Sequence, residues 1–253
     1  RFVNEKFAAK DKMTYSMPET AEEVARQRNI SREDADEFAV KSHERALQAI
    51  DAGKFDREIV PVSVVGRKGA VTVVDTDEGP RPGTSAEVLS RLSPVVAGGE
   101  VTTAGNASSL NDGASAVVVA SQAAIDKYGL QPRARIAGST AVGVAPEIMG
   151  IGPVPATKKL LDVTGWELSS VDAIELNEAF ASQSLACIRE LGLAEAKVNA
   201  WGGAIALGHP LGSSGSRLVT TLLHRLEDAQ EQRGIATLCV GVGQGCAIAI
   251  ERV

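Results

Sequence analysis

One histidine lies in a segment whose residue types suit acid–base chemistry. His209 stands between Gly208 and Pro210, within a stretch at residues 202–215 that is rich in glycine and serine and spans a predicted strand-to-helix junction. In this position His209 could act as a general base or as an oxyanion donor. A base requires a neutral imidazole, and a helix N-terminus favours that neutral form. The alternative is a loop histidine that only caps the helix. The patterned glycines and serines favour the catalytic interpretation.

A second candidate, Cys239, ends an apolar segment directly before the turn that contains Gly241 and Gly243. A thiol in this position can shuttle a proton or act as a nucleophile, with the Gly241 N–H as an oxyanion donor. For Cys239 alone, a buried structural cysteine is the better interpretation. Combined with the His209 segment, the two glycine-rich turns instead indicate the parts of an acyl-transfer site.

Asn177 lies where another predicted strand, at residues 171–176, gives way to a helix. Asparagine is a favoured helix N-cap, and it is equally suited to fixing a water or a carbonyl in a site, so both interpretations stay open. The other cysteines, Cys187 and Cys246, are expected in the core. His43 and His224 fall in helical patterns and are expected at the surface or its boundary.

Composition narrows the classes of function. The chain has 253 residues and a net charge of −6 without a basic block, which argues against nucleic-acid binding. No apolar run reaches the roughly 20 residues of a membrane-spanning helix. The three cysteines lack metal-ligand spacing, and their odd number argues against a disulfide framework, which favours the cytoplasm. Because the chain starts at Arg1, we expect a piece of a longer protein.

The predicted elements alternate along the second half of the chain, which indicates an α/β fold. Capping-box spacing predicts a helix that begins at Thr20, and Ser31 caps a longer helix that ends before Gly53. Further helices are predicted at 122–128, 155–162, 179–191 and 209–227. Strands are predicted at 59–65, 71–74, 114–120, 133–144, 171–176, 198–201, 236–240 and 246–252. We expect a mostly parallel sheet with a terminal antiparallel hairpin. The turn at 241–245 precedes a strand, which excludes a dinucleotide-binding loop.

Seven segments resemble, in order, landmarks of the thiolases, enzymes that make or break 3-ketoacyl-CoA. They are residues 1–4, 17–22, 104–113, 149–156, 175–181, 202–215 and 238–245. Ketosynthases share the fold but have different site motifs. The resemblance implies a thiolase-like fold in which residues 1–110 form the loop domain and its flanks. Residues 111–131 would be the last strand and helix of an incomplete N-terminal domain, and residues 132–253 a C-terminal βαβαβαββ domain.

The resemblance also assigns chemical roles to four residues. His209 resembles the base that activates a nucleophilic cysteine and later stabilises a thioester oxyanion, and Asn177 resembles the holder of a water in that oxyanion hole. Cys239 resembles the acid/base for the α-carbon, and the Gly241 amide resembles part of a second oxyanion hole. Two acyl transfers each build charge on a thioester oxygen, so such preorganised donors are needed.

Substrate contacts and partners follow from the same resemblance. Positions that resemble pantetheine contacts are Ser108, Leu110, Met149, Ala179 and Phe180, and Arg81 resembles a residue near the nucleotide end of CoA. The resemblance implies acyl-CoA and CoA as substrates, no separate cofactor and no metal, and a homo-oligomer, dimer or tetramer, when full length. The net charge and the lack of a long apolar run argue against a nucleic-acid or membrane partner.

Two features depart from the family pattern. The acyl-accepting cysteine of thiolases lies upstream of the part matched here, and neither Cys187 nor Cys246 has its context. We therefore expect no turnover from this chain alone. Residues 240–244 resemble 3-oxoadipyl-CoA and other degradative thiolases, whereas some acetoacetyl-type members have histidine where Ser16 stands.

Three interpretations are compatible with this pattern. The first is part of an ordinary thiolase. The second is a natural, non-catalytic CoA-binding half that works with a separate N-terminal chain. The third, a degenerate structural subunit, is disfavoured because a scaffold has no need for His209, Cys239 and Asn177 together.

Overall fold

The computed structural model describes residues 15–253, so the family-like segment at residues 1–4 lies outside the described part. Two helices open it, α2 (Met17–Arg28) and α3 (Arg32–Asp51). Ser31 caps α3 as predicted, through a hydrogen bond from the Asp34 N–H. The predicted start of the first helix at Thr20 is wrong, because a capping box of Ser16 and Glu19 begins α2 earlier. Thr20 instead lies inside the helix.

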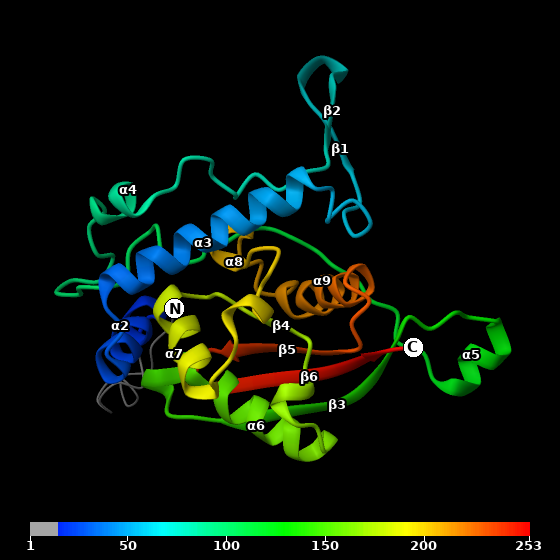
Figure 1. Ribbon diagram of the computed structural model, residues 1–253. Helices are drawn as coiled ribbons and strands as arrows, with labels where there is room; N and C mark the ends of the chain where they lie inside the picture. The colour runs from blue at the N-terminus through cyan, green and yellow to red at the C-terminus, as the bar shows by residue number, and fades with distance from the viewer. Residues whose placement is uncertain (1–14) are drawn as a thin grey trace, which may run out of the picture.

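A four-stranded sheet forms the centre of the second half (Figure 1). Its strands are β3 (Ala134–Gly143), β4 (Ala173–Leu176), β5 (Arg233–Val240) and β6 (Gln244–Arg252), and their order across the sheet is β3-β6-β5-β4. β4 and β5 pair in parallel, whereas β6 is antiparallel to both of its neighbours. The prediction of a mostly parallel sheet is wrong, because β6 lies between β3 and β5 and two of the three pairings in this sheet are antiparallel. The predicted antiparallel hairpin at the end of the chain is confirmed by β5 and β6. The strand predicted at 198–201 is reduced to one parallel bridge between Val198 and Ile174.

Helices cover both faces of this sheet. α6 (Pro153–Thr164) and α7 (Ala181–Leu191) share one apolar cluster with one face, and α9 (Ser214–Asp228) packs on the other. Neighbouring residues of β5 show the division, because Ile235 belongs to the first cluster and Ala236 to the second. Burial on both faces explains the apolar run of β5 from Ile235 to Val240, which only Thr237 interrupts.

The helix predicted at 209–227 begins five residues later than expected. Residues 209–213 form a turn in which the Pro210 carbonyl accepts hydrogen bonds from the N–H groups of Ser213 and Ser214. The short helix α8 (Ala204–Leu207), which the sequence analysis missed, precedes this turn. His209 therefore lies in a connection between two helices.

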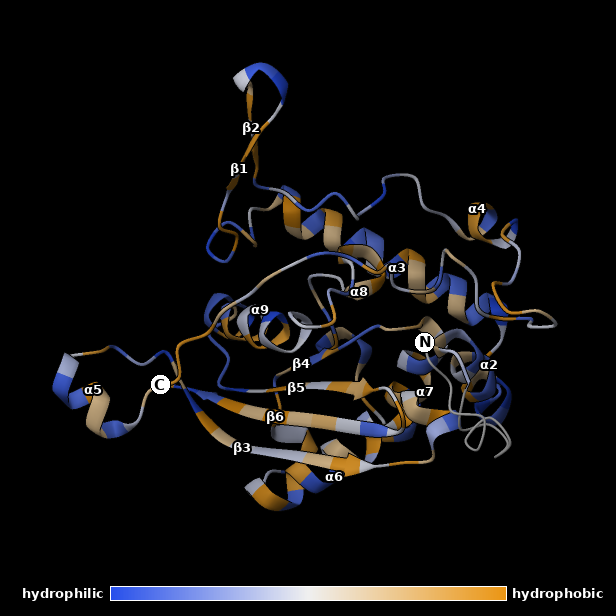
Figure 2. Cartoon of the chain, turned by 180° about the vertical axis from the view of Figure 1, so that it is seen from behind, coloured by the Kyte–Doolittle hydropathy of each residue, from blue (hydrophilic) through white to orange (hydrophobic). Residues whose placement is uncertain are grey.

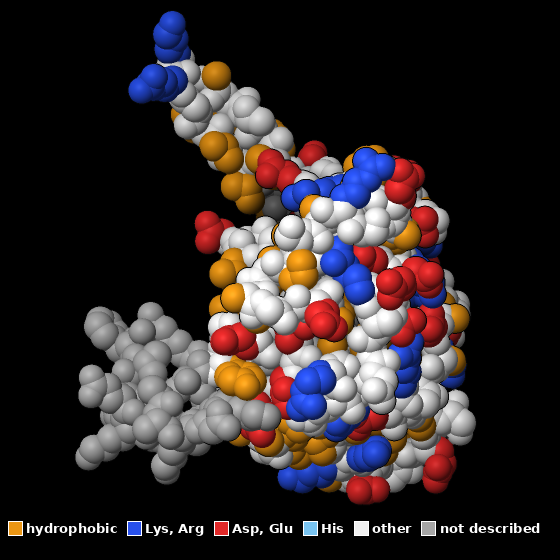
Figure 3. Space-filling model, turned by 90° about the vertical axis from the view of Figure 1, so that its left-hand side faces the viewer, with side chains coloured by type: hydrophobic (Ala, Val, Ile, Leu, Met, Phe, Trp, Pro, Cys, Tyr) orange, Lys and Arg blue, Asp and Glu red, His pale blue; other side chains and the backbone are white. Residues whose placement is uncertain are grey.

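A hairpin projects from the body (Figures 1 and 2). Its strands β1 (Val62–Val65) and β2 (Val71–Val74) confirm the prediction for this region, and η1 (Arg67–Gly69) connects them. Figure 2 colours both strands as hydrophobic, and all their valines are exposed. Figure 3 shows basic side chains at the tip.

The buried strand predicted at residues 114–120 is absent. This segment is extended but pairs with no strand in the described part of the chain, and Val118 is 92% exposed. Without a neighbouring strand its backbone has no ladder to join, so apolar composition alone does not make it a strand. The remaining elements are α4 (Ala86–Ser90), α5 (Gln122–Tyr128), η2 (Pro146–Ile151), η3 (Leu168–Ser170) and η4 (Glu195–Lys197). Among residues 15–253, no helix combines the length and apolar character needed to cross a bilayer.

Candidate active site

Backbone contacts fix His209 in the connection between α8 and α9. Gly208 has a φ of 91°, and a Cβ on it would lie 2.4 Å from the Asn111 side-chain oxygen, so only glycine fits. The His209 N–H donates to the Ser109 carbonyl at 3.1 Å and is also 3.3 Å from the Asn111 Oδ1. The segment at 109–111 thus holds the histidine from outside its own loop.

Both ring nitrogens of His209 have partners. Nδ1 lies 2.6 Å from the Ser214 Oγ, and Nε2 lies 3.2 Å from the Asn177 Nδ2. Burial lowers the pKa of His209, and the positive charge of Arg217 lowers it further. The imidazole is therefore neutral at pH 7, the state that a general base requires.

Asn177 brings the end of the parallel strand pair into the site. It is the first residue after β4, and its N–H donates to the Thr237 carbonyl of β5 at 3.0 Å. Its side chain is buried, with Nδ2 facing His209 and Oδ1 without a hydrogen-bond partner in the described part of the chain. Phe180, not Asn177, is the N-cap of α7. The structure therefore removes the capping interpretation of Asn177.

Cys239 lies two residues beyond Thr237 on β5 and is 6% exposed. It packs in an apolar cluster with Met149 and Ala179, against which Met17 and Phe180 also lie. Burial raises the pKa of the Cys239 thiol to about 12, so it is a neutral proton donor at pH 7. The turn that follows is sterically exacting at Gly243, because a Cβ there would lie 2.2 Å from the Val144 carbonyl oxygen.

Most of the predicted substrate contacts gather around this cluster. The N–H and the Oγ of Ser108 each donate to the Ala179 carbonyl at 3.0 Å, which ties the 104–113 segment to the region of Cys239. Leu110 is 82% exposed. It stands between Ser109 and Asn111, the two residues that contact the His209 N–H. Gly241 follows β5 in the same turn as Gly243, and a Cβ on it would lie 3.8 Å from the sulfur of Met17.

Within residues 15–253, Arg81 forms no hydrogen bond or ion pair with any other predicted site residue. Its side chain is exposed, and its backbone N–H donates to His43 Nδ1 at 3.2 Å. His43 and His224 were predicted at the surface or its boundary, but both are buried. His43 meets the loop of Arg81, and His224 Nδ1 lies 3.0 Å from Glu58 Oε2. These loop contacts are long-range in sequence, so a helical pattern does not reveal them.

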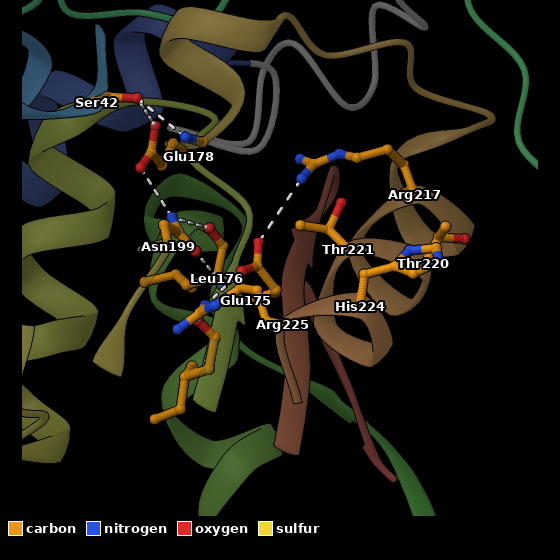
Figure 4. A network of polar contacts seen from close by, with 12 residues as sticks. Ser42, Glu175, Leu176, Glu178, Asn199, Arg217, Thr220, Thr221, His224 and Arg225 are labelled. Atoms are coloured by element: carbon orange, nitrogen blue, oxygen red, sulfur yellow. Dashed lines mark hydrogen bonds and ion pairs between the residues drawn. The ribbon is translucent and has the colours of Figure 1, made fainter. Parts of the chain in front are cut away.

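A buried carboxylate behind the site was also missed. Glu178 accepts hydrogen bonds from Ser42 Oγ at 2.6 Å, from Asn199 Nδ2 at 2.8 Å and from the Ile205 N–H at 3.2 Å (Figure 4). It therefore joins α3, the Asn199 loop and the first turn of α8, which leads to His209. Burial raises the pKa of Glu178. Its position next to Asn177 is the only signal for it in the sequence.

A second buried acid anchors α9 to the sheet. Glu175 of β4 is 2.5 Å from Arg225 Nη1 and 3.7 Å from Arg217 Nη1, both on α9 (Figure 4). Arg225 also donates to the Ile174 carbonyl at 3.1 Å. These contacts fix α9, and with it Ser214, relative to the strand that carries Asn177.

The other two cysteines lie away from the imidazole of His209. Cys187 is buried in α7, where its thiol contacts the Gly150 carbonyl, and burial raises its pKa. Cys246 is half-buried in β6, opposite Leu238. Within residues 15–253, no group of His, Cys, Asp and Glu side chains is arranged to hold a metal ion. The described site therefore offers a neutral base, amide groups and a protonated thiol.

The fold is that of known thiolases. The structure of acetyl-CoA acetyltransferase from Bacillus anthracis superposes with a TM-score of 0.90 at 47% identity, covering 94% of this chain and 60% of that one. Human mitochondrial 3-ketoacyl-CoA thiolase gives a TM-score of 0.91 at 45% identity, with the same coverage of 94% and 60%. The fold therefore defines an α/β protein of the thiolase type.

Sequence comparison gives the family. The thiolase N-terminal domain matches residues 5–123 and the thiolase C-terminal domain matches residues 114–252. The beta-ketoadipyl-CoA thiolase of Pseudomonas aeruginosa is 59% identical over 239 residues, which cover 94% of this chain and 59% of that protein. The chain belongs to the thiolase family. It spans about three fifths of the length of these relatives.

Proposed function

We propose that this chain is part of an acyl-CoA C-acyltransferase that makes or cleaves 3-ketoacyl-CoA. The observation that carries the proposal is the contact between Asn177 and His209 at the end of the parallel strand pair β4–β5. The buried Cys239 is the last residue but one of β5. A neutral base, an amide and a protonated thiol are the groups that two successive acyl transfers require.

In the cleavage direction, a cysteine thiolate adds to the C3 carbonyl of a 3-ketoacyl-CoA, and the bond between C2 and C3 then breaks. The departing enolate keeps C1, C2 and the original CoA, and it takes a proton from Cys239. The rest of the acyl chain stays on the nucleophile as a thioester. CoA then attacks that thioester and regenerates the thiol. His209 takes the proton of the nucleophilic cysteine and returns it when that thiol is regenerated, and the Cys239 thiolate takes the proton of the attacking CoA. Asn177 with the Gly241 N–H stabilises the oxyanions.

We assign the nucleophilic cysteine to sequence outside this chain. In support, His209 contacts Ser214 and Asn177, whereas Cys187, Cys239 and Cys246 all have other neighbours. The chain alone is then inactive. The alternative, a natural CoA-binding half that works with a separate N-terminal chain, keeps the same residues and differs only in which polypeptide carries the nucleophile.

For the substrates, the proposal is a CoA thioester whose pantetheine passes Ser108, Leu110, Met149, Ala179 and Phe180, with Arg81 near the nucleotide end. The name of the Pseudomonas aeruginosa relative and the turn at 240–244 favour a degradative substrate of the 3-oxoadipyl-CoA type. We further propose a cytoplasmic homo-oligomer for the full-length protein. The three cysteines of this chain, Cys187, Cys239 and Cys246, are free thiols, which supports the compartment.

The test combines mass with activity. An antibody to this chain isolates the native protein, whose intact mass shows whether one polypeptide carries the missing part. That protein is assayed for thiolysis of 3-oxoadipyl-CoA and acetoacetyl-CoA beside the pure 253-residue chain. We expect turnover only from the longer protein, and a loss of about 10²- to 10⁴-fold on His209→Ala or Cys239→Ala. Turnover by the pure chain would overturn the assignment of the nucleophile.

A mass that matches the short chain would instead favour the alternative, and co-purification would then identify the second polypeptide. Absence of thiolysis in every preparation would contradict the proposed reaction itself.

A further inference from the structure

Ser214 stands behind the His209 ring in a position that controls its protonation pattern. It is the first residue of α9, and its side chain is fully buried. Its Oγ lies 2.6 Å from His209 Nδ1 and donates to the Pro210 carbonyl at 3.1 Å. A hydroxyl has one proton to donate and two lone pairs that accept. When its proton points to the carbonyl, which only accepts, the oxygen accepts from Nδ1–H.

The other side of the ring is consistent with this direction. The Asn177 Nδ2 donates toward Nε2 at 3.2 Å, which requires a lone pair on Nε2 and therefore the proton on Nδ1. The hydrogen bonds then run in one direction, from Asn177 to His209, from His209 to Ser214 and from Ser214 to the Pro210 carbonyl. The charged group that acts on the ring is Arg217 of α9, and its charge disfavours a second proton.

We propose that Ser214 is a positioning residue that holds His209 as the Nδ1–H tautomer and so leaves Nε2 as the proton acceptor. The catalytic meaning of this arrangement rests on the proposed function, whereas the tautomer itself does not. Ser214 is itself held in place, because Glu175 binds Arg217 and Arg225 of the same helix and fixes α9 against β4.

The tautomer is measured directly in this chain by NMR of the ¹⁵N-labelled histidine rings at pH 8, where His209 is neutral. The chain has three histidines, so the spectrum of His209→Asn assigns the relevant signals. We expect a protonated Nδ1 and an unprotonated Nε2. In Ser214→Ala we expect the population to shift toward the Nε2–H tautomer that free histidine prefers in water.

Two variants make the result specific. Ser214→Thr keeps the hydroxyl and is expected to retain the Nδ1–H signal. Thr220→Ala removes a hydroxyl that donates to the Ser216 carbonyl of the same helix at 2.9 Å, so it controls for general effects on α9. An Nε2–H tautomer in the unmodified chain, or an unchanged tautomer in a folded Ser214→Ala, would overturn the proposal.

The catalytic consequence is measured separately in the longer native protein. There, Ser214→Ala is expected to lower kcat by about 10²-fold with little change in KM, because proton transfer is affected and substrate binding is not. Equal kcat values for Ser214→Ala and Thr220→Ala would overturn the catalytic part. If no preparation shows thiolysis while the ring signals behave as expected, the proposed function fails and the role of Ser214 in setting the tautomer stands.

Discussion

His43 of α3 is 6% exposed, and its Nδ1 accepts a hydrogen bond from the Arg81 N–H at 3.2 Å. Burial lowers the pKa of His43, and the positive charge of Arg81 lowers it further. An acceptor nitrogen cannot keep this bond once it is protonated. The contact between α3 and the Arg81 loop therefore depends on a neutral ring.

This arrangement predicts acid sensitivity of the fold. Because the folded pKa lies below that of the unfolded chain, about 6.5, the unfolded state takes up the proton first as the pH falls. The contribution of His43 to the unfolding free energy is then fully present above about pH 6.5 and declines as the pH falls below that value. We expect His43→Asn, whose Oδ1 replaces the accepting Nδ1, to reduce the loss of unfolding free energy between pH 7.5 and 5.5 in urea titrations.

His209, whose pKa is also lowered, leaves part of the pH dependence in the His43→Asn variant. An undiminished decline in that variant would show that His43 does not titrate in this way.

At the level of single residues, candidate site residues could be predicted from the sequence where a histidine or cysteine stands among glycines. The glycine-rich surroundings singled out His209 and Cys239, and the structure joins Asn177 to His209. The sequence did not single out Ser214, which lies inside the 202–215 segment, or Glu178. Serine and glutamate are usually surface residues, and only the fold shows that these two are buried.

Glu178 connects three elements by hydrogen bonds alone. Its partners are all donors, and Asn199 cannot rotate to become an acceptor because its Oδ1 already accepts from the Leu176 N–H at 2.8 Å. A glutamine at position 178 would face a donor with its own NH₂ group in either orientation.

We therefore expect Glu178→Gln to destabilise the chain by about 1–3 kcal/mol, the cost of leaving buried donors unsatisfied. Glu44→Gln, on an exposed part of the same α3, is the matched control and should change stability by less than about 0.5 kcal/mol. Urea unfolding of both variants makes the comparison. Similar values for the two would mean that the carboxylate is dispensable.

Two glycines allow α6 and β6 to approach closely. A Cβ on Gly245 would lie 2.0 Å from the Gly152 carbonyl oxygen, and one on Gly152 would lie 2.4 Å from the Gln244 carbonyl oxygen. Gly152 has a φ of −49°, so only space, and not backbone conformation, demands glycine there.

Gly152→Ala is expected to destabilise the fold by about 1–3 kcal/mol through overpacking. Gly215→Ala, in α9 with open space around its Cα, should be neutral or stabilise by up to about 1 kcal/mol. Thermal unfolding compares the two variants. A Gly152→Ala variant as stable as the original chain would show that α6 shifts freely.

Helices and turns that depend on local contacts could be predicted from the sequence. Strands could not always be predicted, because a strand forms only where a second strand pairs with it. Ser31 caps α3, and the Gly-rich turn closes the β1–β2 hairpin, both through local contacts. The segment at 114–120 has strand composition but no partner strand, and only the three-dimensional arrangement reveals that. α9 starts at Ser214 and not at His209, whose N–H donates to the Ser109 carbonyl, a long-range contact that the local sequence does not reveal.

On the scale of the molecule, two segments of residues 15–253 expose several valines close together in sequence. One is the projecting hairpin, and the other is the 114–120 segment with its three exposed valines, Val117, Val118 and Val119. Patches of this kind favour association. We expect the isolated chain to self-associate in light scattering at micromolar concentration.

Val118→Lys is expected to lower the associated fraction more than Gln122→Lys, which adds the same charge at a neighbouring exposed position without removing apolar surface. A monodisperse monomer at all concentrations would contradict this expectation.

The position of β6 between β3 and β5 also determines when the sheet can form in a cell. β6 is translated after its two neighbours, so β3 and one side of β5 have no partner while the ribosome is still making residues 244–252. A nascent chain at that stage carries open strand edges, which are prone to wrong pairing and are typical targets of chaperones. A stop codon upstream of β6 would accordingly leave two unconnected pieces of sheet, not a shortened one.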